Sequence, residues 1–377
     1  MTVPNGANDA LWRTPLHSRA SFAAQTAEEK LRYLASAGHA APSSHNTQPW
    51  RFMIHPTAFG IDVFINQGAI LPASDVKGRQ AVISVGCAIE NIKTAAAYFG
   101  YHMHIMFAAQ KPDAFRPQRT PITENRLLPL ATLAFHEEPS ITGDEGVFAG
   151  LWSRKVIRAE FDLTRAIPNE AQAELVSLLS DTGLTPRFIT DALRRRAIAE
   201  FQGQADGYVI NSPAFSKELG AWLLPNDTDS PLGMPGSNFG LTDEQAMRLH
   251  KGLLGEAALE PEDGLRFALA GKLGIEQSPL ICVLTSKNDE PADWLRAGMA
   301  LERSLLFFHA RGFATAIHAG LVEVGLVNRM FAMTLGTRER ILALFRVGKP
   351  KRAEDSARPH SPRLPLEAIL VSPPREP

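Results

Sequence analysis

A predicted helix followed by a predicted strand occurs twice in this chain, 212 residues apart. In the first copy, apolar residues recur with a helical period over residues 85–99, Gly100 ends the helix, and Tyr101–Phe107 has the composition of a strand. Five of twenty aligned positions are identical in the second copy, against about one or two expected from average composition. The identical pairs are Gly86 and Gly298, Ala88 and Ala300, Glu90 and Glu302, Gly100 and Gly312, and Ile105 and Ile317. Such a repeat predicts a duplicated unit, here in two copies.

The length of the chain agrees with two units. A chain of 377 residues is long for one ordinary domain, and 45% hydrophobic against 21% charged residues is typical of a globular protein with a large core. Residues 138–150 lie between the two copies and are rich in turn formers. These are Pro139, Ser140, Gly143, Asp144 and Gly146. We therefore expect a first half over residues 1–145 and a second half over residues 146–377.

Charge, cysteines and hydropathy exclude several classes of protein. A formal net charge of −1 gives no general attraction to nucleic acid or to an anionic membrane. Cys87 and Cys282 form no CxxC pair, and we expect buried thiols in a reducing compartment. The first residues have neither a basic start nor an apolar core for export, and no apolar run is long enough to span a membrane, so we expect a cytoplasmic protein. No P-loop, GxGxxG fingerprint or GxSxG elbow is present.

The densest group of polar side chains lies in a short turn at residues 42–49. A predicted helix over Glu28–Ala37 precedes this turn, and predicted strands at residues 51–54 and 61–65 follow it. Prolines at both ends stiffen the turn, so its hydrogen-bonding groups suit a planar ligand edged with carbonyls and ring nitrogens. These groups belong to Ser43, Ser44, Asn46, Thr47 and Gln48. An ordinary helix-to-strand turn with capping hydroxyls is the alternative.

The run from Pro42 to Trp50 resembles the flavin-contacting loop of the nitroreductase family, commonly Pro-Ser-x-x-Asn-x-Gln-Pro-Trp. The matching residues are Pro42, Ser43, Asn46, Gln48, Pro49 and Trp50. The resemblance implies an α+β fold of mixed or antiparallel sheets flanked by helices, with FMN as cofactor. It assigns Pro42, Ser43, Ser44, Asn46 and Gln48 to that cofactor.

The duplication resembles the Acg-like branch of this family, whose single chains carry two unequal nitroreductase halves. Ordinary nitroreductases are homodimers in which both chains contact the flavin. A fused pair would build that arrangement within one chain, as an intrachain pseudo-dimer. The resemblance thus implies a monomer or a weak homodimer.

Two basic segments are candidates for the FMN phosphate, which needs local positive charge and several donors. Residues 152–158 resemble the family's Arg-x-Ser-x-Arg/Lys element, with Arg154, Lys155 and Arg158 matching and Val156 where serine is usual. A solvated basic turn is the alternative. Near the C-terminus, Arg363 before Leu-Pro resembles the late arginine that returns to the phosphate.

The tail around Arg363 has an alternative interpretation as a charged, partly disordered segment. That interpretation fits the other basic residues of the tail better, namely Lys349, Lys351, Arg352 and Arg358. Both phosphate elements lie in the second half, whereas the Pro42–Gln48 loop lies in the first. We therefore expect one complete flavin site in each chain rather than two.

Three further features bear on the site. Residues 315–320 resemble the segment whose backbone N–H groups face the flavin N5, a role that falls to Ala319 and Gly320; the neighbouring His318 either tunes protonation there or is simply packed. The turn-rich stretch at residues 224–241 is a lid over the flavin or a surface excursion. His102 and His104 face the same side of a predicted strand, but we expect no metal because no third ligand is near in sequence.

The leading functional hypothesis is an FMN-dependent oxidoreductase that passes electrons from NAD(P)H to a nitroaromatic or quinone-like acceptor. No side-chain acid or base is required, so no catalytic residue is predicted. The alternative is a non-catalytic FMN-binding protein whose lid prevents turnover. A flavin-free interaction protein that kept only the fold is a third hypothesis.

Overall fold

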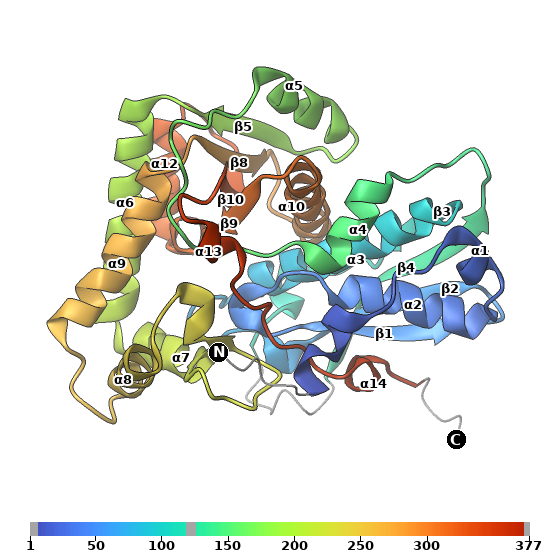
Figure 1. Ribbon diagram of the computed structural model, residues 1–377, viewed down its shortest axis with the longest axis horizontal. Coiled ribbons are helices and arrows are strands. Elements are labelled where there is room, and N and C mark those ends of the chain that lie inside the picture. Colours follow the sequence, from blue (N-terminus) through green and yellow to red (C-terminus); the bar gives the residue numbers. More distant parts are fainter. Residues whose placement is uncertain (1–6, 118–125, 373–377) are drawn as a thin grey trace. The chain divides into compact units, whose positions relative to one another are not determined.

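The computed structural model describes residues 7–117 and 126–372, and Figure 1 shows their helices and strands. The chain forms two compact units, each with a four-stranded sheet. Unit 1 consists of Met1–Arg154, Glu290–Leu306 and Pro362–Pro377, and unit 2 of Lys155–Asp289 and Phe307–Ser361. Two late segments therefore belong to unit 1, namely the C-terminal segment and most of helix α10 (Pro291–Ala310).

The sheet of unit 1 has the strand order β1-β2-β4-β3, with every neighbouring pair antiparallel. Its strands are β1 (Trp50–His55), β2 (Gly60–Asn66), β3 (Tyr101–Phe107) and β4 (Leu127–Glu137). Along β3, buried Tyr101 and Met103 alternate with exposed His102 and His104, so only one face of the sheet is covered here. The helices of unit 1 besides α10 are α1 (Arg19–Ala23), α2 (Ala27–His39), α3 (Arg79–Tyr98), α4 (Glu145–Ser153) and α14 (Leu366–Ile369). Short 3₁₀ turns lie at Ala7–Arg13, Ser44–Asn46, Gln67–Ala69 and Pro112–Ala114.

The sheet of unit 2 has the order β5-β8-β10-β9, again antiparallel throughout. Its strands are β5 (Thr185–Ile189), β8 (Leu280–Ser286), β9 (Ala314–Ile317) and β10 (Arg340–Gly348). All of β8 and nearly all of β10 are buried, which means that both faces of this sheet are covered. The helices of unit 2 are α5 (Asn169–Leu178), α6 (Ala192–Asn211), α7 (Pro213–Trp222), α8 (Asp243–Leu254), α9 (Pro261–Glu276), α11 (Gly320–Glu323), α12 (Gly325–Thr334) and α13 (Ala353–Ser356). A two-stranded parallel ladder joins β6 (Leu223–Leu224) to β7 (Met234–Pro235), and a 3₁₀ turn follows at Gly236–Phe239.

The two sheets have the same plan. The first copy contains, in sequence order, α2, β1, β2, α3, β3 and β4, and the second contains α5, β5, β8, α10, β9 and β10. The strand orders of the two sheets agree position by position. The short turn between β1 and β2 is replaced by helices α6 to α9 between β5 and β8. The predicted α+β fold with a duplicated unit is confirmed.

The two repeat helices α3 and α10 cross at equivalent glycines. A Cβ atom on Gly86 would lie 2.2 Å from the carbonyl oxygen of Leu295, and one on Gly298 would lie 1.9 Å from that of Ile83. Since Leu295 is the repeat equivalent of Ile83, each helix presents the same surface to the other, as at the two-fold axis of a homodimer. Both copies of the repeat have glycine at this position because only a residue without a Cβ atom lets the two helix backbones approach so closely.

Most predicted elements are confirmed, although one helix starts earlier than expected. The helix predicted from residue 85 begins at Arg79, because Asp75 accepts hydrogen bonds from the N–H groups of Gln80 (3.0 Å) and Ala81 (2.9 Å). Both cysteines are buried free thiols, as predicted.

None of the helices in the described ranges is long and apolar enough to cross a membrane. Within those same ranges, no three His, Cys, Asp or Glu side chains are grouped to hold a metal ion.

Candidate functional site: a cluster of arginines in unit 2

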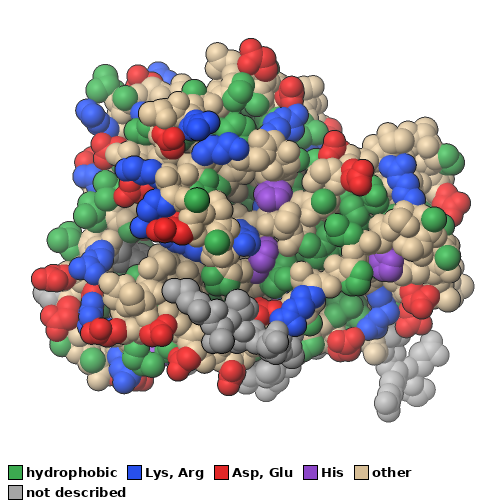
Figure 2. Space-filling view, viewed as in Figure 1, with side chains coloured by type: hydrophobic (Ala, Val, Ile, Leu, Met, Phe, Trp, Pro, Cys, Tyr) green, Lys and Arg blue, Asp and Glu red, His purple; other side chains and the backbone are tan. Residues whose placement is uncertain are grey.

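Four basic side chains gather in unit 2 beside β10. They belong to Lys155, Arg158, Arg346 and Arg358. Arg346 lies in β10 and is 2% exposed; it donates to the carbonyl of Ala159 (2.7 Å) and to Nε2 of His318 (2.9 Å). Figure 2 shows Lys and Arg side chains gathered at the surface around α13.

Arg158 is the least satisfied member of this group, which we call the arginine cluster. Its guanidinium lies 4.7 Å from the ring centre of Phe239 and forms no hydrogen bond or ion pair with any residue in the described part of the chain. Its carbonyl oxygen accepts a hydrogen bond from Arg358 Nη1 (3.1 Å). A half-buried guanidinium with unused donors favours an anionic ligand.

Negative charge in the cluster comes from Asp355, which is 3% exposed. Asp355 pairs with Arg358 and is shared with Arg352 (3.1 Å). Lys155 Nζ donates to the carbonyl of Arg358 (2.8 Å), and burial lowers its pKa. The positive charges outnumber the acidic partner, so the cluster keeps an excess of positive charge.

The pKa values show the resulting repulsion. Burial, and then the charge of Arg358, lowers the pKa of Arg158 to about 10. The pKa of Arg346 falls to about 9 through burial, Arg158 and Arg358. Burial, then the charges of Arg346 and Arg158, hold the pKa of His318 well below its usual value, so that imidazole is neutral and accepts from Arg346. An oxyanion with two charges would relieve this repulsion.

The stretch predicted as a lid or a surface excursion folds against this cluster. Phe239 covers Arg158, and Gly240 (φ 74°) lies so close to Arg358 that a Cβ atom would come within 2.8 Å of its Nη2. Asn238 donates to the carbonyl of Pro359 (3.2 Å) and accepts from Ser361 Oγ (3.2 Å). The segment therefore shields the arginines within unit 2.

The Pro42–Gln48 loop belongs to unit 1 and has a strained backbone. His45, Asn46 and Gln48 have φ values of 48°, 57° and 50°, a left-handed conformation that non-glycine residues rarely adopt. Ser43 Oγ accepts from Gln48 N (3.0 Å), and Ser44 N donates to Ser84 Oγ (3.4 Å). Strain of this kind persists where the surrounding contacts fix it, which is common at binding sites.

Arg363 is one of the residues that fix this loop. Its Nη1 donates to Asn46 Oδ1 (2.7 Å), and its other nitrogens donate to the carbonyls of His39 (3.1 Å) and Ala41 (2.9 Å) at the end of α2. Asn46 in turn donates to the carbonyl of Pro362 (2.9 Å), and Gln48 accepts from Leu364 N (2.9 Å). The structure thus brings Arg363 to the predicted ring-binding loop, in unit 1, whereas Lys155 and Arg158 belong to unit 2.

Arg154 pairs with one of the repeat glutamates. Its Nε and Nη2 contact Oε1 of Glu302 at 3.1 and 2.9 Å, and both side chains are at most 4% exposed. The repeat equivalent, Glu90, pairs with Arg303 (2.6 Å). Burial raises the pKa of Glu302 to about 7, an effect that Arg154 opposes. Both repeat glutamates therefore hold an arginine within unit 1.

Ala319 precedes α11 and Gly320 begins it, and we call this connection after β9 the Ala319–Gly320 turn. His318 N donates to the carbonyl of Leu344 (3.0 Å), which keeps the turn beside β10. A Cβ atom on Gly320 would lie 3.1 Å from Asp206 Oδ1 and 3.1 Å from Gln202 Nε2. The backbone of this turn is therefore in close contact with α6.

Sequence reasoning did not select Arg346, Arg358 or Asp206 as site residues. A charged residue inside the apolar run of β10 was a usable signal for Arg346, since buried arginines need partners. Arg358 lies in a segment whose composition also fits a solvated tail, and no local pattern marks it.

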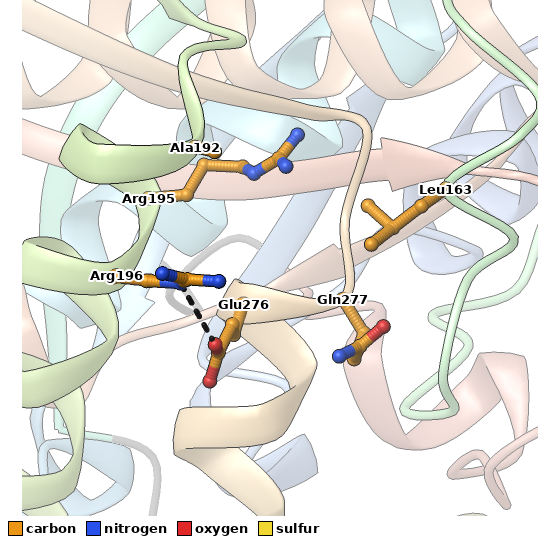
Figure 3. Close-up of a pocket in the computed structure, with 6 residues that line it drawn as sticks. All are labelled: Leu163, Ala192, Arg195, Arg196, Glu276 and Gln277. Atoms are coloured by element: carbon orange, nitrogen blue, oxygen red, sulfur yellow. Dashed lines mark ion pairs between the residues drawn. The ribbon is translucent and has the colours of Figure 1, made fainter.

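A separate small pocket opens at the start of α6 (Figure 3). Its volume is about 90 Å³, and Arg196 lies 3.5 Å from Glu276 at its edge. The lining residues are Leu163, Ala192, Arg195, Arg196, Glu276 and Gln277.

The chain is similar to three kinds of mycobacterial protein over most of its length, and no family model matches it. An uncharacterised protein of Mycobacterium tuberculosis H37Rv is 26% identical, with 88% of this chain and 89% of that protein covered. "Putative NAD(P)H nitroreductase Rv3131" of the same strain is 24% identical over 92% of both chains. "Putative NAD(P)H nitroreductase acg" of that strain is 23% identical, with 88% and 92% covered. The resemblance to Acg-type nitroreductases is confirmed.

Solved structures give weaker similarities. A crystal structure of "a putative nitroreductase" from Anabaena variabilis is 10% identical, covers 93% of both chains and has a TM-score of 0.48. The FMN-dependent nitroreductase NfnB of Mycobacterium smegmatis, solved with NADPH, is 16% identical, covers 59% of this chain and 95% of its own, and has a TM-score of 0.40.

Proposed function

We propose that this chain is an FMN-dependent oxidoreductase that accepts electrons from NAD(P)H. The observation that carries the proposal is the excess positive charge of the arginine cluster in unit 2, with the unused donors of Arg158 at its centre. A phosphate monoester has two charges and several acceptor oxygens, which are the properties that such a cluster stabilises. The names of the Acg-type relatives support NAD(P)H as the electron donor.

The residues divide into those that contact the cofactor and those that hold the contacting groups. Lys155 and Arg158 are proposed to bind the phosphate directly, with Arg346 and Arg358 beside them. Arg154 and Arg363 were predicted to take part as well, and their existing partners favour a positioning role. The proposed contacts to the flavin ring are Pro42, Ser43, Ser44, Asn46, Gln48, Ala319 and Gly320.

FMN supplies the redox chemistry when it is bound, whereas the chain supplies binding, orientation and electrostatics. The strained Pro42–Gln48 loop presents fixed polar groups, which lowers the entropic cost of ordering a ligand. Small residues at Ala319 and Gly320 allow backbone N–H groups to approach a ring closely. A nitroaromatic or quinone-like compound is the proposed acceptor.

Anaerobic spectroscopy tests the proposal. The purified protein is saturated with FMN, freed of excess, and titrated with NADPH and with NADH while the flavin absorbance is followed. We expect about one FMN per chain and loss of the oxidised spectrum with at least one donor. A protein that holds FMN but is bleached by neither donor would refute the oxidoreductase proposal, and a ratio near two would refute the single site.

A second function, FMN storage without turnover, is favoured by one observation. The segment that contains Phe239 and Gly240 covers two arginines of the cluster, so a closed segment would block access. Under this alternative, Phe239→Ala would speed the release of FMN, and the bound flavin would resist both nicotinamide donors. Reduction of the bound flavin by NADPH or NADH, at a rate that sustains repeated turnover, would exclude FMN storage.

A further inference from the structure

A buried carboxyl group that the proposed chemistry does not use lies beside the Ala319–Gly320 turn. Asp206 of α6 is 9% exposed, and its Oδ1 accepts a hydrogen bond from Gln202 Nε2 (2.7 Å), one helical turn earlier. Gln202 is only 3% exposed. The two side chains form a buried polar pair.

Two glycines make room for this pair. A Cβ atom on Gly271 of α9 would lie 2.0 Å from Asp206 Oδ2, so a larger residue there would displace the carboxyl group. A Cβ atom on Gly320 would lie 3.1 Å from the other carboxyl oxygen. The pair is therefore enclosed by the backbone of α9 on one side and by the backbone of the turn on the other.

The hydrogen bonds of the pair are incomplete. Within the described residues, Gln202 Oε1 is buried and has no hydrogen-bond partner. Among the ionisable side chains next to the two glycines, Lys272 on α9 is ion-paired with Glu200 (2.6 Å), and Glu323 lies on α11. Burial raises the pKa of Asp206 to about 7, opposed only by the bond from Gln202.

A proton changes the pairing. When Asp206 is ionised, it accepts from the amide nitrogen of Gln202, and the amide oxygen stays unpaired. When Asp206 is neutral, its O–H can donate to that oxygen once the amide has rotated by half a turn, and the amide nitrogen then gives up its bond to the carboxyl group. Proton binding and the orientation of the Gln202 amide are thus linked.

We propose that Asp206 and Gln202 are a proton-binding positioning pair for the Ala319–Gly320 turn. The proposal rests on the proposed function, in which this turn faces the flavin. If reduction of bound FMN placed negative charge at the turn, the carboxylate of Asp206 would bind one proton from solvent. No bond to the cofactor forms or breaks, and Asp206 is neither oxidised nor reduced.

The first test uses flavin-free protein. The thermal midpoints of the parent, Asp206→Asn and a control, Asp113→Asn on an exposed position, are compared between pH 5 and pH 8. A buried acid with a raised pKa favours folding while it is neutral and loses that contribution as the pH rises from about 4 through 7. As the pH rises, the thermal midpoints of the parent and the control should therefore fall relative to that of Asp206→Asn. Parallel curves for all three proteins would overturn the proton linkage.

The second test measures proton uptake with a pH indicator during anaerobic reduction of the FMN-loaded proteins in weak buffer. Near pH 7.5, the parent and Asp113→Asn should take up more protons for each flavin than Asp206→Asn, by up to one. Equal uptake would overturn the link to the turn. A chain that binds no FMN would instead refute the proposed function, and the stability curves would still decide whether Asp206 binds a proton as stated.

Discussion

The crossing of α3 and α10 at Gly86 and Gly298 predicts the effect of adding a single methyl group. In Gly298→Ala, the new Cβ would lie 1.9 Å from the carbonyl oxygen of Ile83 and 2.8 Å from the Cα atom of Gly86. Both neighbours are backbone atoms of a helix, so they cannot move aside as a flexible side chain could. The helices must separate by more than an ångström, which breaks the packing on either side of the crossing.

The expected loss can be estimated from two opposing terms. Overpacking of a core costs about 1–3 kcal/mol, whereas replacing a helical glycine by alanine gains about 0.5–1 kcal/mol. Because the obstacle is backbone, we expect a net destabilisation of about 2 kcal/mol. Gly86→Ala, whose Cβ would lie 2.2 Å from the carbonyl oxygen of Leu295, should behave in the same way. The double variant should cost less than the sum, since one separation accommodates both methyl groups.

The assay is urea denaturation followed by circular dichroism. Gly207→Ala in α6 is the control, because a Cβ atom there meets nothing within 4 Å, and it should be stabilised by about 0.5–1 kcal/mol. If Gly298→Ala is as stable as the parent, or gains stability as Gly207→Ala does, the close crossing of the repeat helices is wrong.

Three further predictions follow from the ion pairs and the arginine cluster. Arg303→Met should destabilise the protein by about 3 kcal/mol because it leaves Glu90 buried without its partner, and adding Glu90→Gln should recover most of that loss, as urea midpoints would show. Arg363→Met should loosen the Pro42–Gln48 loop, which would appear as faster amide hydrogen exchange there and unchanged exchange in β8. Arg158→Met should raise the thermal midpoint of the flavin-free protein by relieving repulsion, whereas inorganic phosphate should raise the midpoint of the parent and not that of the variant; equal responses to phosphate would count against an anion site.

The repeat could be predicted because it depends on local patterns. Gly100 and Gly312 both have positive φ (81° and 71°) at the ends of α3 and α10, so each copy kept the same residue for the same backbone reason. The start of α3 could not be predicted, because its cap comes from Asp75 across a left-handed Gly78 rather than from an adjacent Ser or Thr.

The candidate site was predicted in part. Lys155 and Arg158 were found because they match a local motif. Their neighbours Arg346 and Arg358 lie about 190 to 200 positions away in sequence, so only the folded chain of unit 2 brings them together. Asp206 was missed for a related reason, since its burial depends on Gly271 and Gly320 in other helices.

Comparing the affinities of FMN and riboflavin isolates the contribution of the phosphate to binding, because the two ligands differ only in that group. Quenching of flavin fluorescence would be measured for the parent, for Arg158→Ala, and for Arg329→Ala, a control on the exposed face of α12. We expect the parent to bind FMN far more tightly than riboflavin. We also expect that Arg158→Ala alone loses about tenfold to a hundredfold of FMN affinity while its riboflavin affinity stays unchanged. Equal affinities of the parent for the two flavins, or full FMN affinity in Arg158→Ala, would contradict a phosphate site at the arginine cluster.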